Sequence, residues 1–444
     1  FDPEWEKHGI LNEVCREAAA WGTRMLPRGT YDVQQEPGRT PALIFSVPGT
    51  GLYAGREEDT VFFYGHLDKQ PPATGWSEGL GPFTRVVRDG KLYGRGCSDD
   101  GYSVYAALTA IRALEDAGIP HPRAVGLIET REESGSNDLE HYLKKNAARF
   151  GSPRLVCVLD SGAGNYEQLW LTSSLRGACA IDLNVRVLRQ GMHSGTASGV
   201  VPSSFDVLRI LLDRIQDPRT GAILDPAFNV EIPSNRMDDL KKTAEVLGDG
   251  FISEFPWAEG PNGSVQSQCR GTEEALIARC WKPTLSVTGA AGLPPLSMAG
   301  NSLRSDTTLR LSFRLPPTAK TENILPALQK KLLTDPPFNA VVSIAGGDAL
   351  PGWNAPSEAD WFRSACDESS KALWGKPAMR IGEGGSIPIL NLFEAQFPRA
   401  QFAVTGVLGP GSNAHNADES LDLAYTEKFI AAVGYLAASI PEEA

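Results

Sequence analysis

Histidines, paired cysteines and long apolar runs are scarce or absent in this 444-residue sequence. Only six histidines occur, so any chemistry that depends on imidazole has few candidates. The seven cysteines are odd in number, scattered and never spaced as C-x-x-C. Neither a disulfide framework nor a thiolate zinc site is indicated, and we expect a reducing, cytoplasmic location. No apolar run approaches the roughly 18 residues of a membrane helix. The chain begins at Phe1 rather than Met, which is compatible with a removed leader.

Basic residues are also in deficit, with 42 Lys and Arg against 54 Asp and Glu and a formal net charge of -12. A surface of that sign repels nucleic acid and anionic membranes, so we expect neither as a partner. The 41% of hydrophobic residues and 22% of charged residues are typical of a globular protein with about two domains.

The two ends of the chain share one pattern. Residues 1–175 alternate short apolar runs with amphipathic helical patterns, which predicts a mostly parallel sheet. The predicted elements are strands at 61–64, 124–130 and 154–159 and a helix at 102–117. From Gly352 the pattern resumes, with a strand at 400–407 and a closing helix at 425–440. We therefore predict a discontinuous α/β domain made of residues 1–177 and 350–444.

The middle of the chain follows another order. Its predicted elements are a strand at 179–188, a helix at 203–216, strands at 284–290 and 305–315, a helix at 321–334 and a strand at 340–346. This β-α-β-β-α-β order is that of the ferredoxin-like split unit. Residues 217–283 elaborate it and are expected to be partly helical around 237–247. We predict a smaller α+β domain, residues 178–349, inserted into the α/β domain.

Polar side chains follow four predicted strands where each strand ends. They are His66 and Asp68, Glu132 and Glu133, Asp160, and His415. Each alone has an ordinary structural explanation: His66 can be satisfied by hydrogen bonds in a turn, the Glu132-Glu133 pair can lie in a solvated loop, and Asp160 can begin a turn. Ligands bind outside the carboxyl ends of strands in open α/β sheets, however, so these groups should converge.

A fifth segment, the glycine-rich turn from Tyr93 to Gly101, leads into helix 102–117 and contains Asp99 and Asp100. Its glycines permit a tight turn, and an acidic residue at a helix start is favoured by the helix dipole. Adjacent side chains point apart, so we expect one aspartate to face the crevice and the other to cap the helix.

Two histidines with Asp99, Glu133 and Asp160 make a nitrogen and oxygen donor set that suits zinc and tolerates manganese or cobalt. One carboxylate that bridges two ions about 3.5–4 Å apart leaves each ion one histidine and one further carboxylate. Glu132, beside Glu133 but directed elsewhere, is then free to deprotonate a metal-bridging water, whose hydroxide is the nucleophile. Asp68, two residues after His66, would hold the His66 ring in the correct tautomer.

The sequence resembles the dinuclear zinc peptidases of the M20 family, which include carnosinases, cytosolic nonspecific dipeptidase, succinyl-diaminopimelate desuccinylase and aminoacylase. It is most similar to the carnosinase-like dipeptidases, over nearly the whole chain. The motifs that carry the resemblance are Gly65-His66-Leu67-Asp68, Gly94-Arg95-Gly96 through Asp99-Asp100, Glu132-Glu133-Ser134-Gly135-Ser136, Leu159-Asp160, Leu175-Arg176-Gly177, His193-Ser194-Gly195, Gly384-Gly385-Ser386-Ile387-Pro388 and His415.

The resemblance implies a zinc-peptidase-like α/β catalytic domain with an inserted lid and dimerisation domain. It implies two divalent ions per subunit, with Asp99 as the bridging ligand and Glu132 as the general base. The metal ligands that it implies are His66, Asp99, Glu133, Asp160 and His415.

The resemblance also gives roles to residues of the inserted domain and of the Gly384 loop. It implies a homodimer in which His193 reaches the partner's active site and polarises the scissile carbonyl. Arg314 and the loop Gly384-Gly385-Ser386 match groups that hold the substrate carboxylate. Asn301 is a further substrate-binding position.

Three departures from the family pattern leave the metal ligands untouched. Gly101 and Tyr102 follow Asp100 where a lysine is usual. Gly382 replaces an arginine before the Gly384 loop, and Ala345-Gly346-Gly347 replaces His-Gly-Gly. The last change removes one expected partner of the substrate carboxylate.

Other functional classes fit less well. Gly49, Gly51 and Gly55 lack the spacing of a dinucleotide-binding loop, and no G-x-S-x-G elbow occurs. An inactive metal- or peptide-binding protein has no need of the base Glu132. We predict a metal-dependent hydrolase that cleaves the amide bond of a dipeptide or similar small substrate with a free carboxylate. An N-acyl-amino-acid amidohydrolase, such as an aminoacylase or deacylase, is the alternative, because the sequence does not identify the residues that line the acyl pocket.

Overall fold

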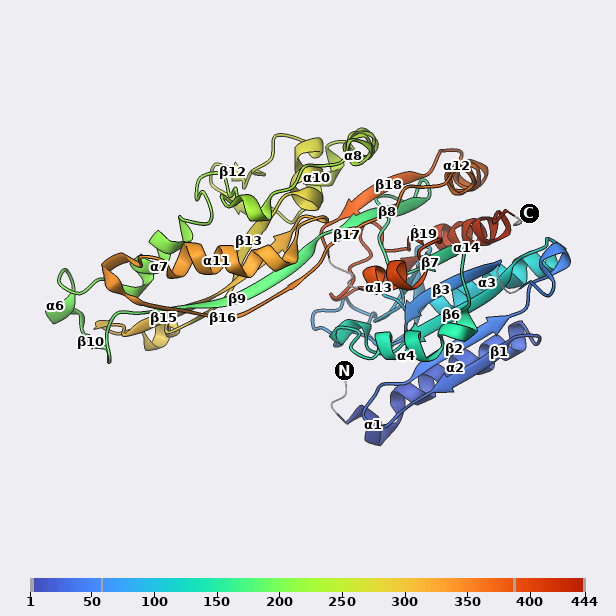
Figure 1. The fold of residues 1–444 in the computed structure, drawn as a ribbon, viewed down its shortest axis with the longest axis horizontal. Coiled ribbons are helices and arrows are strands. Elements are labelled where there is room, and N and C mark those ends of the chain that lie inside the picture. The colour runs from blue at the N-terminus through green and yellow to red at the C-terminus, as the bar shows by residue number, and fades with distance from the viewer. Residues whose placement is uncertain (1–3, 57–58, 386–388, 442–444) are drawn as a thin grey trace. The chain divides into compact units, whose positions relative to one another are not determined.

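The computed structural model describes residues 4–56, 59–385 and 389–441, which form two compact units (Figure 1). The first unit comprises 4–56, 59–173, 355–381 and 389–441, and the second comprises 174–354 and 382–385. These boundaries lie within a few residues of 178 and 349. Residues 382–385 group with the second unit, whereas the sequence division places them with 350–444. In the described part of the chain, no helix combines the length and apolar character needed to cross a bilayer.

The first unit is built on a six-stranded sheet with the order β1-β2-β6-β3-β7-β19 (Figure 1). Its strands are β1 (Thr30–Gln34), β2 (Ala42–Val47), β3 (Thr60–His66), β6 (Arg123–Glu129), β7 (Leu155–Val158) and β19 (Gln401–Val404). The last four in the sheet are parallel to one another, and β1 and β2 are antiparallel. The mostly parallel sheet agrees with the prediction, and the carboxyl ends of its parallel strands lie at one edge.

Helices cover both faces of this sheet, so its strand β3 is buried over its whole length. On one face, α3 (Ser103–Asp116) packs against β3 and contacts α2 (Ile10–Met25) and α14 (Leu423–Ala438). On the other, Phe62 of β3 packs against Phe150 of α5 (Ala147–Phe150) and Phe393 of α13 (Ile389–Gln396). The remaining helices are α1 (Trp5–His8), α4 (Leu139–Lys145) and α12 (Asp360–Trp374), the last packed on α14.

A second, smaller sheet of the first unit has the order β20-β5-β4. Its strands are β4 (Val86–Arg88), β5 (Lys91–Tyr93) and β20 (Ser420–Asp422). It joins the segment before the Asp99 turn to the segment after His415. The chain passes from one unit to the other within β8 (Trp170–Leu175), directly after β17 (Trp353–Asn354) and within β18 (Met379–Glu383).

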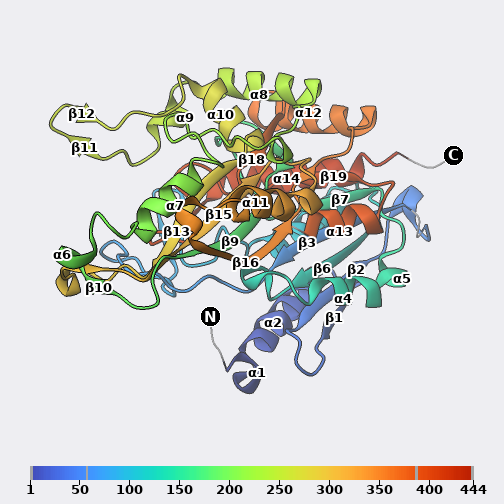
Figure 2. The ribbon, with the colours of Figure 1, turned by 60° about the vertical axis from the view of Figure 1, so that its left-hand side comes forward.

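The second unit contains a four-stranded antiparallel sheet with the order β13-β15-β9-β16. Its elements in chain order are β9 (Gly177–Arg186), α7 (Ser204–Leu212), β13 (Thr284–Ala291), β15 (Asp306–Leu315), α11 (Ile324–Leu333) and β16 (Val341–Leu350). Both helices lie on one face of the sheet (Figure 2) and bury alternate residues of β9 and β15. The order and pairing confirm the predicted ferredoxin-like unit.

The elaboration at 217–283 has more helix than the predicted stretch at 237–247. It includes α8 (Ser234–Leu247), α9 (Gly250–Ser253), β11 (Glu259–Gly260), β12 (Gly263–Ser264) and α10 (Thr272–Trp281). Outside this range, the second unit also contains β10 (Met192–His193), α6 (Ser194–Ala197) and β14 (Ser302–Leu303). Helices α8 to α10 bury a small core of their own around Leu240, Leu276 and Trp281. The predicted helix at 237–247 is thus the main part of α8.

Candidate metal centre

Five side chains converge at the carboxyl ends of the parallel strands of the first unit. His66 is the last residue of β3, Asp160 follows β7, and Glu133 lies in a 3-10 turn (Glu132–Ser134) after β6. Asp99 lies in the turn before α3, and His415 in the loop between β19 and β20. These are the positions expected from the strand ends.

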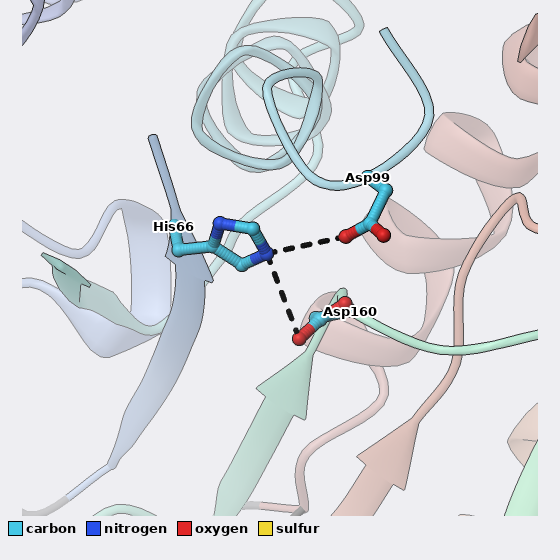
Figure 3. A group of neighbouring side chains, drawn as sticks. All are labelled: His66, Asp99 and Asp160. Carbon is cyan, nitrogen blue, oxygen red and sulfur yellow. Dashed lines mark ion pairs between the residues drawn. The ribbon is translucent and has the colours of Figure 1, made fainter. Parts of the chain in front are cut away.

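Asp99 stands between the two histidines. The Nε2 atom of His66 lies 3.3 Å from Oδ1 of Asp99 and 3.8 Å from Oδ2 of Asp160 (Figure 3). The Nε2 atom of His415 lies 2.8 Å from Oδ2 of Asp99 and 3.3 Å from Oε2 of Glu133. The donor atoms form two groups, His66 with Asp99 and Asp160, and His415 with Asp99 and Glu133. Asp99 belongs to both groups and presents a different oxygen to each histidine.

The chemistry of the donor atoms fits a pair of divalent cations. Each group offers one imidazole nitrogen and two carboxylates, a set that suits zinc, manganese or cobalt. Nε2 of His66 and Oε1 of Glu133 are buried and have no hydrogen-bond partner among the described residues. Buried polar atoms are normally hydrogen-bonded, so a bound ion would account for both exceptions.

Without cations, the two histidines hold protons firmly. Burial alone would lower the pKa of His66, but the carboxylates of Asp68 and Asp99 raise it well above its ordinary value. Hydrogen bonds to Asp99 and Glu133 raise the pKa of His415 to about 10. Burial would raise the pKa of Asp99, but His415 and His66 hold it well below the ordinary range. Cations in the same place would take over the role of these protons.

Glu132 belongs to neither donor group, although it lies beside both. Its Oε2 atom is 4.0 Å from Nε2 of His66. Burial, followed by the charge of Asp160, raises the pKa of the Glu132 carboxyl to about 8. Burial raises the pKa of Asp160 to about 6. In the metal-free protein, burial and the neighbouring carboxylates therefore disfavour the charged form of Glu132.

Asp68 connects His66 with the Glu132 turn. Its Oδ1 atom lies 3.4 Å from Nδ1 of His66, and its backbone oxygen lies 3.1 Å from the same nitrogen. Its carboxylate also accepts hydrogen bonds from the backbone N–H groups of Glu132, at 3.1 Å, and Glu133, at 3.0 Å. The expected contact with the His66 ring is thus accompanied by a second one, which holds the turn, that the sequence did not predict.

Asp100 does not cap α3, so that expectation is wrong. The residue before α3 is Tyr102, whose side chain makes no capping hydrogen bond, and Ser103 donates from its hydroxyl to the backbone oxygen of Asp100, at 2.8 Å. The fully buried Asp100 accepts instead a hydrogen bond from the backbone N–H of His66, at 3.1 Å. A buried backbone donor needs a partner, and here it outweighs the preference of the helix dipole for an acidic residue.

Lys69 and Gln70, the two residues that follow Asp68, were missed by the sequence analysis. Gln70 donates a hydrogen bond from Nε2 to Oε2 of Glu133, at 2.7 Å. The Lys69 side chain occupies the space above Gly96 and Gly101. A Cβ atom on Gly101 would lie 2.7 Å from Nζ of Lys69 and 2.6 Å from the backbone oxygen of Gly96. The position after Asp100, where the family has a lysine, therefore has no room for a side chain. The only signal for Lys69 and Gln70 in the sequence was that they directly follow Asp68.

The second unit holds the other predicted site residues, in two places. His193 pairs with Ser302 across β10 and β14, and the backbone oxygen of Asn301 accepts from the N–H of Ser194, at 2.9 Å. His193 is exposed, and its Nδ1 accepts from the N–H of Gly195, at 3.2 Å. This brings His193 and Asn301 into one neighbourhood.

Arg314 and Gly384 are linked through Arg176, which the sequence analysis gave no role. Arg314 pairs with Thr284 across β15 and β13. Arg176 donates from Nη1 to the hydroxyl of Thr284, at 3.3 Å, and from Nε to the backbone oxygen of Gly384, at 3.2 Å. Gly385 is exposed, and Ser386 lies outside the described residues.

The chain is similar to known proteins over most of its length. Residues 62–440 match the model of peptidase family M20/M25/M40. The chain is 28% identical over 378 residues to the Cys-Gly metallodipeptidase dug1 of Schizosaccharomyces pombe, which covers 82% of this chain and 76% of that protein. It is 26% identical over 373 residues to the Beta-Ala-His dipeptidase of Mus musculus, covering 81% and 73%. The fold matches an M20 family metallo-carboxypeptidase from Sulfolobus solfataricus with a TM-score of 0.75 and 21% identity, covering 97% and 94% of the two chains.

Proposed function

Because the chain belongs to peptidase family M20/M25/M40 and is a metal-dependent peptidase, we propose that it hydrolyses dipeptides and similar small substrates with a free carboxylate. The observation that carries the proposal is the pair of donor groups that share Asp99, with Glu132 beside them. The similarity to a Cys-Gly dipeptidase and a Beta-Ala-His dipeptidase favours dipeptides over N-acyl amino acids.

The centre would hold two divalent ions, and zinc is the metal that we propose for both. One ion would be held by His66, Asp99 and Asp160, and the other by Asp99, Glu133 and His415. Two such ions supply Lewis acidity, which makes water more acidic and polarises an amide carbonyl. With three ligand carboxylates, the ligands themselves leave one positive charge, which favours the approach of a hydroxide or a carboxylate.

Glu132 is the general base of the proposed reaction. It accepts a proton from the attacking water and donates the same proton to the leaving amine. Its position at 4.0 Å from His66 Nε2, outside both donor groups, leaves its carboxylate available for this role. Asp68 positions both His66 and the Glu132 turn, so that base and ligands keep one geometry.

The second unit would bind the substrate carboxylate and provide the dimer contact. Arg314, Gly384, Gly385 and Ser386 would bind the carboxylate, Asn301 would make a further substrate contact, and His193 would act in the partner subunit's site. Two exposed apolar side chains close to His193 in the sequence, Met192 and Val200, support an interface there. Burial of such a patch on association is favourable. The seven free cysteines support the reducing, cytoplasmic location that we propose.

A panel of matched substrates tests the function. Zinc-reconstituted protein is offered Cys-Gly against N-acetylglycine, and β-alanylhistidine against N-acetylhistidine, so that each pair shares its leaving amino acid. We expect kcat/KM to be higher for the dipeptide in each pair. Higher values for the N-acyl compounds would identify an aminoacylase, and turnover of none of the four by the metal-loaded protein would contradict the proposal.

The Glu132→Gln variant tests whether Glu132 is the general base or a metal ligand. It should bind as much metal as the wild type and lose activity by about 10²–10⁴-fold, the contribution of a positioned general base. Loss of a metal ion from this variant would show that Glu132 is a ligand and that the roles are misassigned.

A further inference from the structure

Glu419 organises the turn that carries Asp99, although it comes from the far end of the chain. It lies four residues after His415, and its side chain is fully buried. Its carboxylate accepts five hydrogen bonds, from Nη1 of Arg95 at 2.6 Å, the N–H groups of Gly96 at 2.9 Å, Ser98 at 3.2 Å and Asp99 at 3.2 Å, and the hydroxyl of Ser98 at 3.1 Å. The backbone N–H of the bridging residue Asp99 is thus bonded directly to Glu419.

Arg95 extends this contact to the other two loops of the centre. Its Nε donates to the backbone oxygen of Pro71, at 3.1 Å, in the segment that follows His66 and Asp68. Its Nη2 donates to the backbone oxygen of Asn416, at 2.9 Å, next to His415. One guanidinium therefore joins the three loops that bear His66, Asp99 and His415.

This buried ion pair needs an explanation beyond stability. Removing two charges from water costs as much as a buried pair typically regains, so a salt bridge of this kind is weak evidence for stabilisation. Its further hydrogen bonds named above are to the backbone or a hydroxyl group of the three loops, and the Arg95 guanidinium also lies 6.0 Å from the centroid of the Trp76 ring. What the pair adds is a fixed distance between loops. Metal sites tolerate errors of only about 0.2 Å in the distances between ligand atoms and metal.

We propose that Arg95 and Glu419 are positioning residues that hold Asp99, His66 and His415 at the spacing that two metal ions require. The inference rests on the proposed metal centre and adds residues to it that touch neither metal nor substrate. Outer contacts of this kind typically change metal affinity or activity by about 10–100-fold.

The test compares Glu419→Gln with Glu358→Gln. Glu358 forms a similar buried pair in the same unit, with both oxygens 3.0 Å from the guanidinium of Arg380. The side chains of that pair are 6% and 12% exposed, and Glu358 also forms an ion pair with Arg363, at 3.1 Å. Both variants lose one buried carboxylate, so both should be less stable. Metal affinity is measured by competition of zinc with a chelating dye, and ligand geometry by the visible spectrum of the cobalt-loaded protein.

We expect Glu419→Gln to bind zinc about 10–100-fold more weakly than the wild type and to show an altered cobalt spectrum. Glu358→Gln should bind within about 2-fold of the wild type with an unchanged spectrum, because it lies outside the positioning contacts. Wild-type affinity in Glu419→Gln, or equal weakening in both variants, overturns the inference. Wild-type protein that binds no metal contradicts the proposed function itself, and the inference with it.

A second variant covers the case that Glu419→Gln does not fold. Arg95→Lys keeps the buried positive charge next to Glu419, but a lysine has no planar fork to reach both Pro71 and Asn416. It should weaken zinc binding by about 10-fold while the metal-free protein remains folded. Unchanged zinc affinity in folded Arg95→Lys contradicts the positioning role.

Discussion

The Glu132→Gln change should stabilise the metal-free protein at high pH while it abolishes most of the activity. Glu132 is held in a pocket where its charge is unfavourable, because burial and the carboxylate of Asp160 raise its pKa from 4.5 to about 8. Only 23% of its side chain is exposed, so solvent does little to screen this effect. Glutamine has nearly the same shape and never ionises.

The sign and size follow from proton linkage. Between pH 4.5 and about pH 8, the folded protein keeps the proton of Glu132 whereas the unfolded chain has lost it. The stability that this raised pKa contributes is therefore fully present below pH 4.5 and is lost as the pH rises through about 8. The rise of the pKa from 4.5 to about 8 corresponds, at about 1.4 kcal/mol per unit, to at most about 5 kcal/mol. The variant avoids this cost.

Urea unfolding in the presence of a chelator measures the difference. At pH 8.5 the free energy of unfolding of Glu132→Gln should exceed that of the wild type by up to about 5 kcal/mol, and at pH 5 by a small fraction of that. Glu140→Gln is the control, because its side chain is 54% exposed and its surface ion pair with Lys144 should contribute at most about 1 kcal/mol. A variant that is less stable at pH 8.5, or that has the same effect at both pH values, refutes this account of Glu132.

Three further predictions concern the histidines and the Asp99 turn. The raised pKa of His415, about 10, stabilises the metal-free protein below about pH 6.5, and this contribution is lost as the pH rises through about 10. Chelator should therefore lower Tm more at pH 9 than at pH 6, and an equal fall at both would contradict this. His193→Ala should lose activity at full metal content and regain it in mixed dimers with inactive Glu132→Gln subunits; mixed dimers without activity would exclude a shared site. Gly96→Ala should destabilise more than Gly90→Ala, because both glycines have a φ near +75° but only at Gly96 would the Cβ overlap a neighbouring lysine. Equal free energies of unfolding for the two variants would show that Lys69 moves aside at no energetic cost.

Much of the centre was predictable because strand ends give a position in space. His66, Glu133 and Asp160 each follow an apolar run, and parallel strands bring their carboxyl ends to one edge of the sheet. The pattern of elements in the inserted unit was predictable for a similar reason, since alternation in β9 and β15 and the spacing in α7 and α11 are strong local signals.

Contacts between distant segments were not predictable. Nothing in the sequence around Glu419 indicates that it bonds to Arg95, which lies more than 300 residues away. The same is true of residues 382–385, whose grouping with the second unit depends on contacts such as that of Gly384 with Arg176. The capping role expected of Asp100 failed because a local rule was applied to a residue whose partner, the N–H of His66, lies in another strand.

The most direct test of the account is the number of metal ions bound by each chain. Zinc per chain is measured by mass spectrometry in the wild type and in variants that each remove one proposed ligand. The account predicts two ions for the wild type, one for Asp160→Asn, one for His415→Ala and none held tightly by Asp99→Asn, because Asp99 alone belongs to both donor groups. Asp99→Asn protein that retains two ions, or wild-type protein that binds only one, would contradict it.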